Sequence, residues 1–196
     1  MKFLLFIGSL FASSGVLLAQ DLTPTATPSP SSSPAASSPV ESASPSPTSV
    51  ELYSLDYDED ADLFFSPGTR NTYTGPVFSK GDNGNLEIKG ALKNGKREGF
   101  WTEYYDNGIR SQEGAYRDGK EVGDWKYWFE TAILESQGSY ADGKPIGLWK
   151  NFYENGKPES EGVYADGLME GTWKFYDEET GVEKDSIYKK GAQVSP

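Results

Sequence analysis

The side chains best suited to acid–base or metal chemistry in this sequence are carboxylates, because the chain has no Cys and no His. That composition removes thiolate nucleophiles, imidazole bases and the common zinc ligands. Pairs of carboxylates occur at Glu159 and Glu161 and at Glu178 and Glu179, in expected hairpin tips or on polar strand faces. Because no pair has the distinct environment that acid–base catalysis requires, we expect no catalytic residues, no cofactor and no enzymatic activity.

A second set of carboxylates lies in residues 51–62, ELYSLDYDEDAD. Four aspartates of this segment stand at alternate positions: Asp56, Asp58, Asp60 and Asp62. A calcium-binding loop begins with such an alternation, but Ala61 stands where its turn glycine belongs and Pro67 where its bidentate glutamate belongs. We therefore interpret residues 51–74 as an acidic lead-in and N-terminal cap, and we predict no metal site.

The net charge of −12 limits the possible partners. Residues 1–74 carry two cations and eight anions, and residues 75–196 carry 16 cations and 22 anions. Neither part has the basic stripe that nucleic acid requires, and an anionic bilayer would repel both. We therefore expect a protein partner or a neutral cell-wall glycan, with no nucleic acid and no strong binding to membrane lipid.

The second half of the chain repeats with a period of 24 residues. Four tryptophans keep this spacing: Trp101, Trp125, Trp149 and Trp173. So do four tyrosines, Tyr116, Tyr140, Tyr164 and Tyr188, and four glycines, Gly99, Gly123, Gly147 and Gly171. Counting back one period from Trp101 reaches Val77, which gives five units over residues 75–194. This periodicity is typical of repeat proteins, in which each unit packs on its neighbours.

Each unit is predicted to be a β-hairpin. In the second unit the runs GFWTEYY and IRSQEGAY flank Asn107-Gly108, a pair that favours a two-residue type I′ turn. With that turn, Trp101 lies opposite Gly114 and Tyr116 opposite Gly99, so each large side chain has bare backbone to lie across. The expected structural core therefore consists of the Trp and Tyr series with their glycines: Gly99, Gly114, Gly123, Gly138, Gly147 and Gly162.

The fold class expected from these units is all-β, an elongated antiparallel meander of five hairpins joined by loops such as Asp118-Gly119-Lys120. Two units depart from the pattern. The third has Thr131-Ala132 in place of Asn-Gly, which predicts a wider turn. The fifth has the run DEETG at residues 177–181, which predicts a longer tip, and it has Ser186 where a glycine would face Trp173.

A second aromatic series has the opposite strand parity and therefore lies on the other face of the sheet. Its members also recur every 24 residues: Tyr104, Trp128, Phe152 and Tyr176. They could pack on residues 51–74, on one another across the sheet twist, or in a second half-core. They could instead form a binding surface, because exposed rows of aromatic side chains mark interaction sites.

The N-terminal residues predict export. Residues 1–20, MKFLLFIGSLFASSGVLLAQ, combine Lys2, an apolar run and a small residue at Ala19, as in a secretory signal cleaved near that point. No cysteine follows the apolar run, so a bacterial lipoprotein is excluded. Residues 21–50 are dominated by Ser, Pro, Thr and Ala, which predicts a disordered linker. We expect a secreted, periplasmic or envelope location.

The strings GFWTEYYDNGIRSQEGAYRDGK and GLWKNFYENGKPESEGVYADG resemble the MORN-repeat variant, of the kind found in bacterial YwqK-family antitoxin-like proteins. The resemblance covers about residues 75–191 and implies an elongated sheet of hairpins, a scaffold or interaction role and no catalytic residues. Three functions follow as hypotheses. The first is an exported scaffold for protein–protein interaction, the second a cell-wall or glycan-binding aromatic module, and the third an exported antitoxin-like or immunity-like inhibitor.

Overall fold

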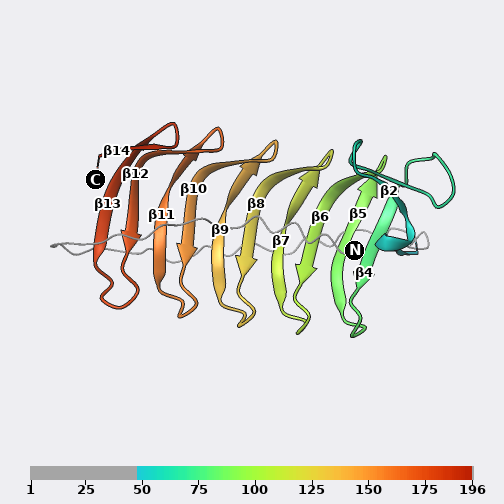
Figure 1. Cartoon of the computed structure of the whole chain (residues 1–196), viewed down its shortest axis with the longest axis horizontal. Coiled ribbons are helices and arrows are strands. Elements are labelled where there is room, and N and C mark those ends of the chain that lie inside the picture. Colours follow the sequence, from blue (N-terminus) through green and yellow to red (C-terminus); the bar gives the residue numbers. More distant parts are fainter. Residues whose placement is uncertain (1–47, 196) are drawn as a thin grey trace, which may run out of the picture.

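The structure, a computed structural model, describes residues 48–195. It is all-β, and its main element is a twelve-stranded sheet in which β4 to β14 follow one another in chain order (Figure 1). The elongated meander expected from the sequence is therefore confirmed. The expected signal at residues 1–20 and most of the expected linker lie outside the described residues. Within residues 48–195, no helix is long and apolar enough to span a membrane.

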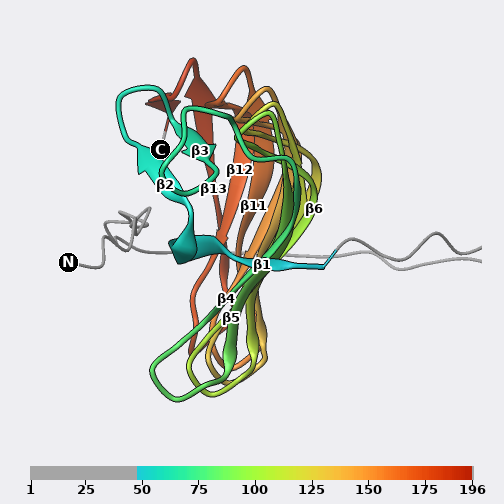
Figure 2. The same ribbon diagram turned by 90° about the vertical axis from the view of Figure 1, so that its right-hand side faces the viewer.

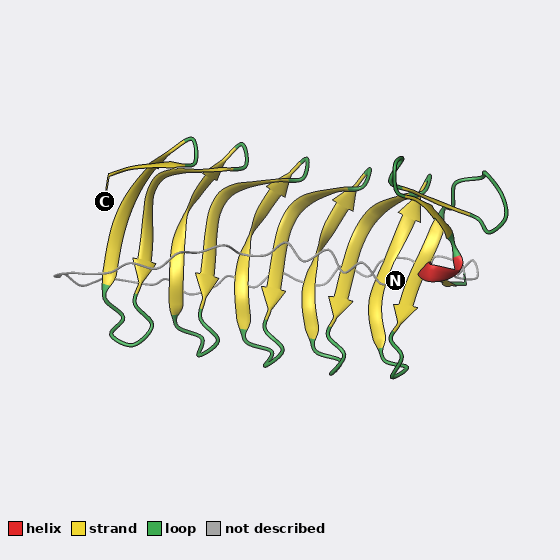
Figure 3. Ribbon diagram, in the orientation of Figure 1, coloured by secondary structure: helices red, strands yellow, loops and turns green. Residues whose placement is uncertain are grey.

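The main sheet starts with β1 (Val50–Glu51), which pairs in parallel with β4, and all its other pairings are antiparallel. Five hairpins follow, each formed by two consecutive strands (Figure 3). Their strands are β4 (Gly75–Lys80), β5 (Leu86–Lys93), β6 (Lys96–Tyr104), β7 (Arg110–Arg117), β8 (Lys120–Trp128), β9 (Leu134–Ala141), β10 (Lys144–Phe152), β11 (Pro158–Ala165), β12 (Leu168–Tyr176) and β13 (Glu183–Lys189). The short strand β14 (Ala192–Ser195) pairs with β13 at the far edge.

The strand register predicted within the hairpins is confirmed. Trp101 pairs with Gly114 and Gly99 with Tyr116 in the second unit. The fourth unit repeats the arrangement between β10 and β11, and the first unit pairs Val77 with its own glycine, Gly90. The Trp series and the Tyr series therefore share one face, as the period-two alternation of a strand requires.

The hairpin tips differ from the predicted type I′ turn. In the second unit the Gly108 N–H donates to the Tyr105 carbonyl at 2.8 Å, and the Tyr105 N–H donates to Ile109 at 2.8 Å. Gly108 has φ +82°, whereas Asn107 is outside the left-handed region, so the loop is a type I turn followed by a left-handed glycine. A bulge opposite Tyr104 then absorbs the third loop residue, which is why the predicted register still holds along the strands.

The type I′ turns lie instead between the units. Asp118 and Gly119 have φ +51° and +84° and connect the paired residues Arg117 and Lys120. Positive φ at both central residues defines this turn type, and its twist matches that of the strands it joins. The connection between hairpins is therefore as tight as a hairpin turn, and pairing continues without interruption from one unit to the next.

The two unusual tips give different outcomes. The third tip keeps the common loop, because the Ala132 N–H donates to Phe129 at 2.9 Å and Ala132 takes the glycine position at φ +66°. The wider turn predicted there is wrong. In the fifth unit the Asp177 N–H donates to Val182 at 3.0 Å and the Gly181 N–H to Asp177 at 2.8 Å. The longer tip predicted there is confirmed.

Each even-numbered strand from β6 to β12 bends sharply at a glycine. On β6, Thr102 pairs with Lys89 and Glu98 with Ala91, so three residues oppose a single one, Gly90. Gly99 lies at this bulge with φ +71°, and its counterparts on β8, β10 and β12 have φ +67°, +65° and +73°. A bulge of this kind bends a strand. Because these four strands bend at the same level, the sheet is a curved single layer (Figure 2).

The segment before the first hairpin packs on the concave side of this sheet (Figure 2). The short 3-10 helix η1 (Leu52–Ser54) and the adjoining Leu55 contribute buried leucines to a cluster with Val77, Leu92 and Trp101. The Trp face is therefore the concave face.

The acidic run of this segment forms a separate small hairpin from β2 (Asp56–Asp58) and β3 (Leu63–Phe65). The Asp58 carboxylate accepts the N–H groups of Asp60 and Ala61 at 3.1 and 3.0 Å, and Asp62 accepts the Tyr57 hydroxyl at 2.8 Å. These carboxylates serve the local turn.

Ala132 provides a test of the tip geometry. A left-handed conformation costs a residue with a Cβ about 1 kcal/mol that glycine avoids, so Ala132→Gly is expected to raise stability by about that amount and Tm by roughly 2–4 °C. Gly108→Ala, one period earlier with no atom within 4 Å of an added Cβ, is expected to lose a similar amount. Thermal unfolding of the full chain measures both. A lower Tm for Ala132→Gly would contradict the shared loop.

Candidate functional site

The concave face is built from one contact that recurs in the second to fifth units. The Trp101 indole lies flat against Gly90 of the preceding hairpin, where an added Cβ would be 2.2 Å from the ring. Its Nε1–H donates to the Ala91 carbonyl at 3.1 Å, at the place where the bend interrupts the ladder. The same two contacts recur for Trp125 on Gly114, Trp149 on Gly138 and Trp173 on Gly162.

This geometry corrects one expectation. The register does pair Trp101 with Gly114, but the ring lies on the glycine of the other neighbouring strand, Gly90. The reason is the bend at Gly99, which turns the side chain back toward the preceding unit. Gly114 is the surface for Trp125 instead. Each tryptophan therefore joins two successive units.

The tyrosines fill the spaces between the tryptophans. Tyr116 meets Trp101 edge-on with ring centroids 5.9 Å apart, and it meets Trp125 edge-on at 5.0 Å. The next pairs continue the alternation as far as Tyr188. Edge-to-face pairs of this kind each stabilise by about 0.5–1.5 kcal/mol beyond the area they bury. All eight ring positions expected in the core thus lie in one continuous row.

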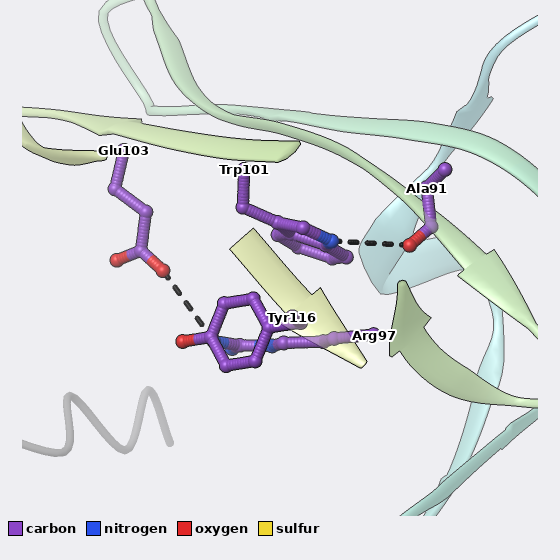
Figure 4. A network of polar contacts seen from close by, with 5 residues as sticks. All are labelled: Ala91, Arg97, Trp101, Glu103 and Tyr116. Atoms are coloured by element: carbon purple, nitrogen blue, oxygen red, sulfur yellow. Dashed lines mark hydrogen bonds and ion pairs between the residues drawn. The ribbon is translucent and has the colours of Figure 1, made fainter. Parts of the chain in front are cut away.

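A polar network that the sequence analysis missed lies on this face in the second unit (Figure 4). The Arg97 guanidinium lies 4.9 Å from the Trp101 ring and 5.2 Å from the Tyr116 ring. It donates to the Tyr116 hydroxyl at 3.0 Å and forms an ion pair with Glu103 at 3.5 Å. The signal available in the sequence was a difference between units, because Arg97 has no basic counterpart one period later, at Glu121.

Burial controls the ionisation of this network. It raises the pKa of Tyr116 to about 12, although Arg97 opposes that shift. Burial also works against the charge on Arg97, but Tyr116 and Glu103 outweigh it, and the pKa of the guanidinium is raised. The tyrosine therefore stays neutral and the arginine charged at neutral pH. The two rings and Glu103 thus hold the charged guanidinium of Arg97, and the Tyr116 hydroxyl is not ionised to act as a nucleophile.

The convex face carries the second aromatic series, Tyr104, Trp128, Phe152 and Tyr176, whose members are all half-buried. Within residues 48–195 no ring contact joins two of them, and the N-terminal segment packs on the opposite face. Polar neighbours cover them in part. Arg110 lies 4.9 Å from the Trp128 ring, and the Tyr176 hydroxyl donates to Glu161 at 3.3 Å.

Beside this series the convex face exposes aliphatic and aromatic side chains that the sequence analysis did not single out. Phe100 is 62% exposed, Leu148 54%, Val163 44% and Ile187 44%. Leu148 pairs directly with Val163 across β10 and β11. Their spacing in the sequence gave only a weak signal, because the apolar character does not recur in every unit. The third unit has Asp124 at the position of Phe100 and Leu148.

A charged row separates the two apolar rows of the convex face. Lysines on β8, β10 and β12 pair with polar residues on the next strand, as in Lys150 with Glu161, whose charged groups are 3.3 Å apart. On β10 the order along the convex face is therefore Leu148, Lys150 and Phe152. Within residues 48–195, no group of three or more side chains is arranged to hold a metal ion. This arrangement can bind a surface of mixed character.

The fold and these two faces define a β-hairpin repeat protein with a single-layer sheet. Residues 145–166, which form most of the fourth hairpin, match the family model of the MORN repeat variant. The resemblance to this repeat is thereby confirmed, and the narrower likeness to YwqK-family proteins stays a prediction. MORN repeats indicate a scaffold for interaction with protein or lipid, in a family that is generally non-enzymatic. The comparison with curated proteins gave no match.

The contact between tryptophan and glycine can be tested in the fourth unit. Gly138→Ala places a Cβ 2.2 Å from the Trp149 ring and is expected to lower the free energy of unfolding by about 3 kcal/mol or slightly less. Gly147→Ala, with φ +65° but no atom within 4 Å, should cost about 1 kcal/mol. Urea unfolding measures both. In Trp149→Ala the cost of Gly138→Ala should largely disappear, and strictly additive costs would refute the contact.

A pH test concerns Glu159, whose pKa is raised by burial, by the charge of Glu135 and by that of Glu178. A raised pKa in the folded state means that ionisation disfavours folding, so stability is lost as the pH rises above the ordinary glutamate pKa of about 4.3. Glu159→Gln should therefore be more stable than the parent at pH 7 and equal to it below about pH 4. Glu154→Gln, at an exposed tip position, is the control. An equal gain at both pH values would contradict the assignment.

Proposed function

We propose that the chain is an exported, non-enzymatic scaffold that binds a protein partner across its convex face. The observation that carries the proposal is the set of uncovered apolar side chains on that face, Phe100, Leu148, Val163 and Ile187, beside the half-buried aromatic series. Exposed apolar groups of this kind mark protein-interaction surfaces. The MORN match supports the scaffold role.

The pattern of the convex face favours a protein over the other partner classes. An interface with protein combines apolar anchors with a polar surround, as Leu148 and Val163 do beside Lys150 and Glu161. A glycan-binding platform needs flat, open rings, whereas Trp128 is half-buried and has Arg110 over its face. Anionic lipid is disfavoured by the net charge of −12. If the chain is an exported antitoxin-like inhibitor, the toxin would be its protein partner.

Export rests on residues 1–20 alone, with their basic start, apolar run and small residue at Ala19. Residues 21–50 would then separate the folded part from the membrane or wall. Mass spectrometry of the chain recovered from the secreted and envelope fractions tests this. An N-terminus at or near Gln20 is expected, and an uncleaved chain confined to the cytoplasm would contradict export.

The binding surface is tested by affinity capture with the exported form of the chain immobilised and incubated with the secreted and envelope proteins of its source. A stoichiometric partner is expected. Leu148→Asp and Trp128→Ala should each reduce its capture at least tenfold, because both remove part of the convex face.

Tyr53→Asp is the matched control, because it also replaces an exposed side chain with a charge. Tyr53 is 63% exposed and lies on η1, away from the convex face. Capture should be unchanged in this variant. Retention of the chain on wall material free of protein, lost in Trp128→Ala, would replace the proposal with a glycan-binding module.

A further inference from the structure

Each unit from the second to the fifth has an aromatic seat on the concave face, which we define as the space beside its Trp and its Tyr. The two rings have nearly the same geometry in each unit. Their centroids are 5.9 Å apart in the second, third and fourth units and 6.5 Å apart in the fifth, always edge-on. What differs between units is the side chain that the chain itself places in the seat.

In the second unit the seat holds a cation. The Arg97 guanidinium lies within 5.2 Å of both ring centroids, donates to the Tyr116 hydroxyl and pairs with Glu103. Arg97 is the second residue of β6, and its side chain reaches along that strand to Glu103. A guanidinium is therefore one group that this pair of rings accepts.

In the third and fifth units the seat holds an aromatic ring. Tyr127 stacks on Trp125 at 6.0 Å, and its hydroxyl donates to that of Tyr140 at 3.1 Å. Phe175 stacks on Trp173 at 6.3 Å in the same way. Both rings occupy the strand position that Glu103 has in the second unit.

In the fourth unit the same two strand positions carry Pro145 and Asn151. Proline has no cation to offer, and the Asn151 amide is turned to Ser160, to which it donates at 2.8 Å. From the preceding unit, Tyr140 meets Trp149 edge-on at 5.1 Å, and the ring centroid of Tyr127 lies 6.3 Å from that of Trp149. Trp149 is accordingly 7% exposed, against 1%, 2% and 0% for its counterparts in the second, third and fifth units. Among the second to fifth units, the fourth is therefore the one whose own strand places neither a cation nor a ring in the aromatic seat.

Two carboxylates lie near the tip ends of β9 and β11, the strands on either side of β10. Ser136 and Ser160 pair with Asn151 from the two sides, and the residues just before them on β9 and β11 are Glu135 and Glu159. Burial raises the pKa of both glutamates, and the charge of Glu135 raises that of Glu159 further. Neither has an ion-pair partner within residues 48–195. The tip ends of β9 and β11 therefore carry two carboxylates that lack a cation.

We propose that the fourth seat, formed by Trp149, Tyr164 and Asn151, is a binding site for an arginine side chain of a partner protein. The guanidinium would take the place that Arg97 takes in the second unit. A planar guanidinium fits better than an ammonium, because it stacks on ring faces while its N–H groups reach a hydroxyl and a second oxygen at once, as Arg97 does in the second unit. The site lies on the concave face, so it adds a specific contact beyond the convex surface proposed above and can fail independently of it.

The test uses the peptide acetyl-Ser-Arg-Ser-Arg-Ser-amide and the indole N–H signal of Trp149 in NMR spectra of the exported chain. A saturable shift at this signal is expected. The citrulline peptide, which has the same shape without the charge, should bind at least tenfold more weakly, and so should the lysine peptide. Equal binding by either of these peptides would overturn the assignment.

Two variants locate the site. Pro145→Arg with Asn151→Glu rebuilds the second unit's arrangement in the fourth and should reduce peptide affinity at least tenfold by filling the seat internally. Pro158→Arg adds the same side chain beside the convex-face residue Phe152 and should leave affinity unchanged. Undiminished binding in the double variant would overturn the proposal.

The reverse change gives an independent readout. Arg97→Ala empties the second seat, so the folded variant should bind two arginine peptides per chain, with the second reported by the Trp101 indole. The spectrum itself reports whether the variant is folded. A folded variant that binds a single peptide would count against the seat as the recognising element.

Discussion

The contact of each Trp indole with a glycine of the preceding hairpin is the constraint on which this fold depends. An isolated hairpin buries too little to be stable in water, and a single-layer sheet has no second layer to bury its side chains against. Here the bend at Gly99 and its counterparts turns each indole back onto bare backbone one strand away. The Nε1–H then donates to a carbonyl at the bend. Curvature, burial and the link between units thus follow from a single contact.

The two ends of the array lack a further hairpin to supply or receive this contact between Trp and glycine, and their sequences differ accordingly. In the first unit Val77 stands one period before Trp101, and Leu52 and Leu55 of the N-terminal segment pack with it. In the fifth unit Ser186 takes the glycine position and is buried, with Gln193 of β14 donating to its hydroxyl at 3.3 Å. A side chain at this position excludes another indole. The short strands β1 and β14 cover part of each edge, which limits further pairing.

Much of this structure was predictable because the period and the strand alternation together determine which residues face one another. The pairings of Trp101 with Gly114 and of Tyr116 with Gly99 needed only that arithmetic. The turn types were not predictable, because Asn-Gly also suits a type I turn with a left-handed glycine. A compensating bulge restores the strand register, so the register does not distinguish the two turns. The prediction also missed that the Trp101 ring lies on Gly90, because strand alternation does not reveal the bend at Gly99. Contacts that cross units, such as the Tyr105 hydroxyl with the Trp128 carbonyl at 2.7 Å, depend on that curvature.

Function in such a repeat is carried by the positions that the repeat does not need. The Trp, the Tyr and the two glycines of a unit are committed to the fold, and their spacing is strict for that reason. The positions of Arg97 and Glu103 are not, and they change from unit to unit, to Glu121 and Tyr127 in the next. On the convex face Phe100 and Leu148 vary in the same way. Differences between units, measured against the constant frame, are therefore where a partner can distinguish one part of this uniform sheet from another.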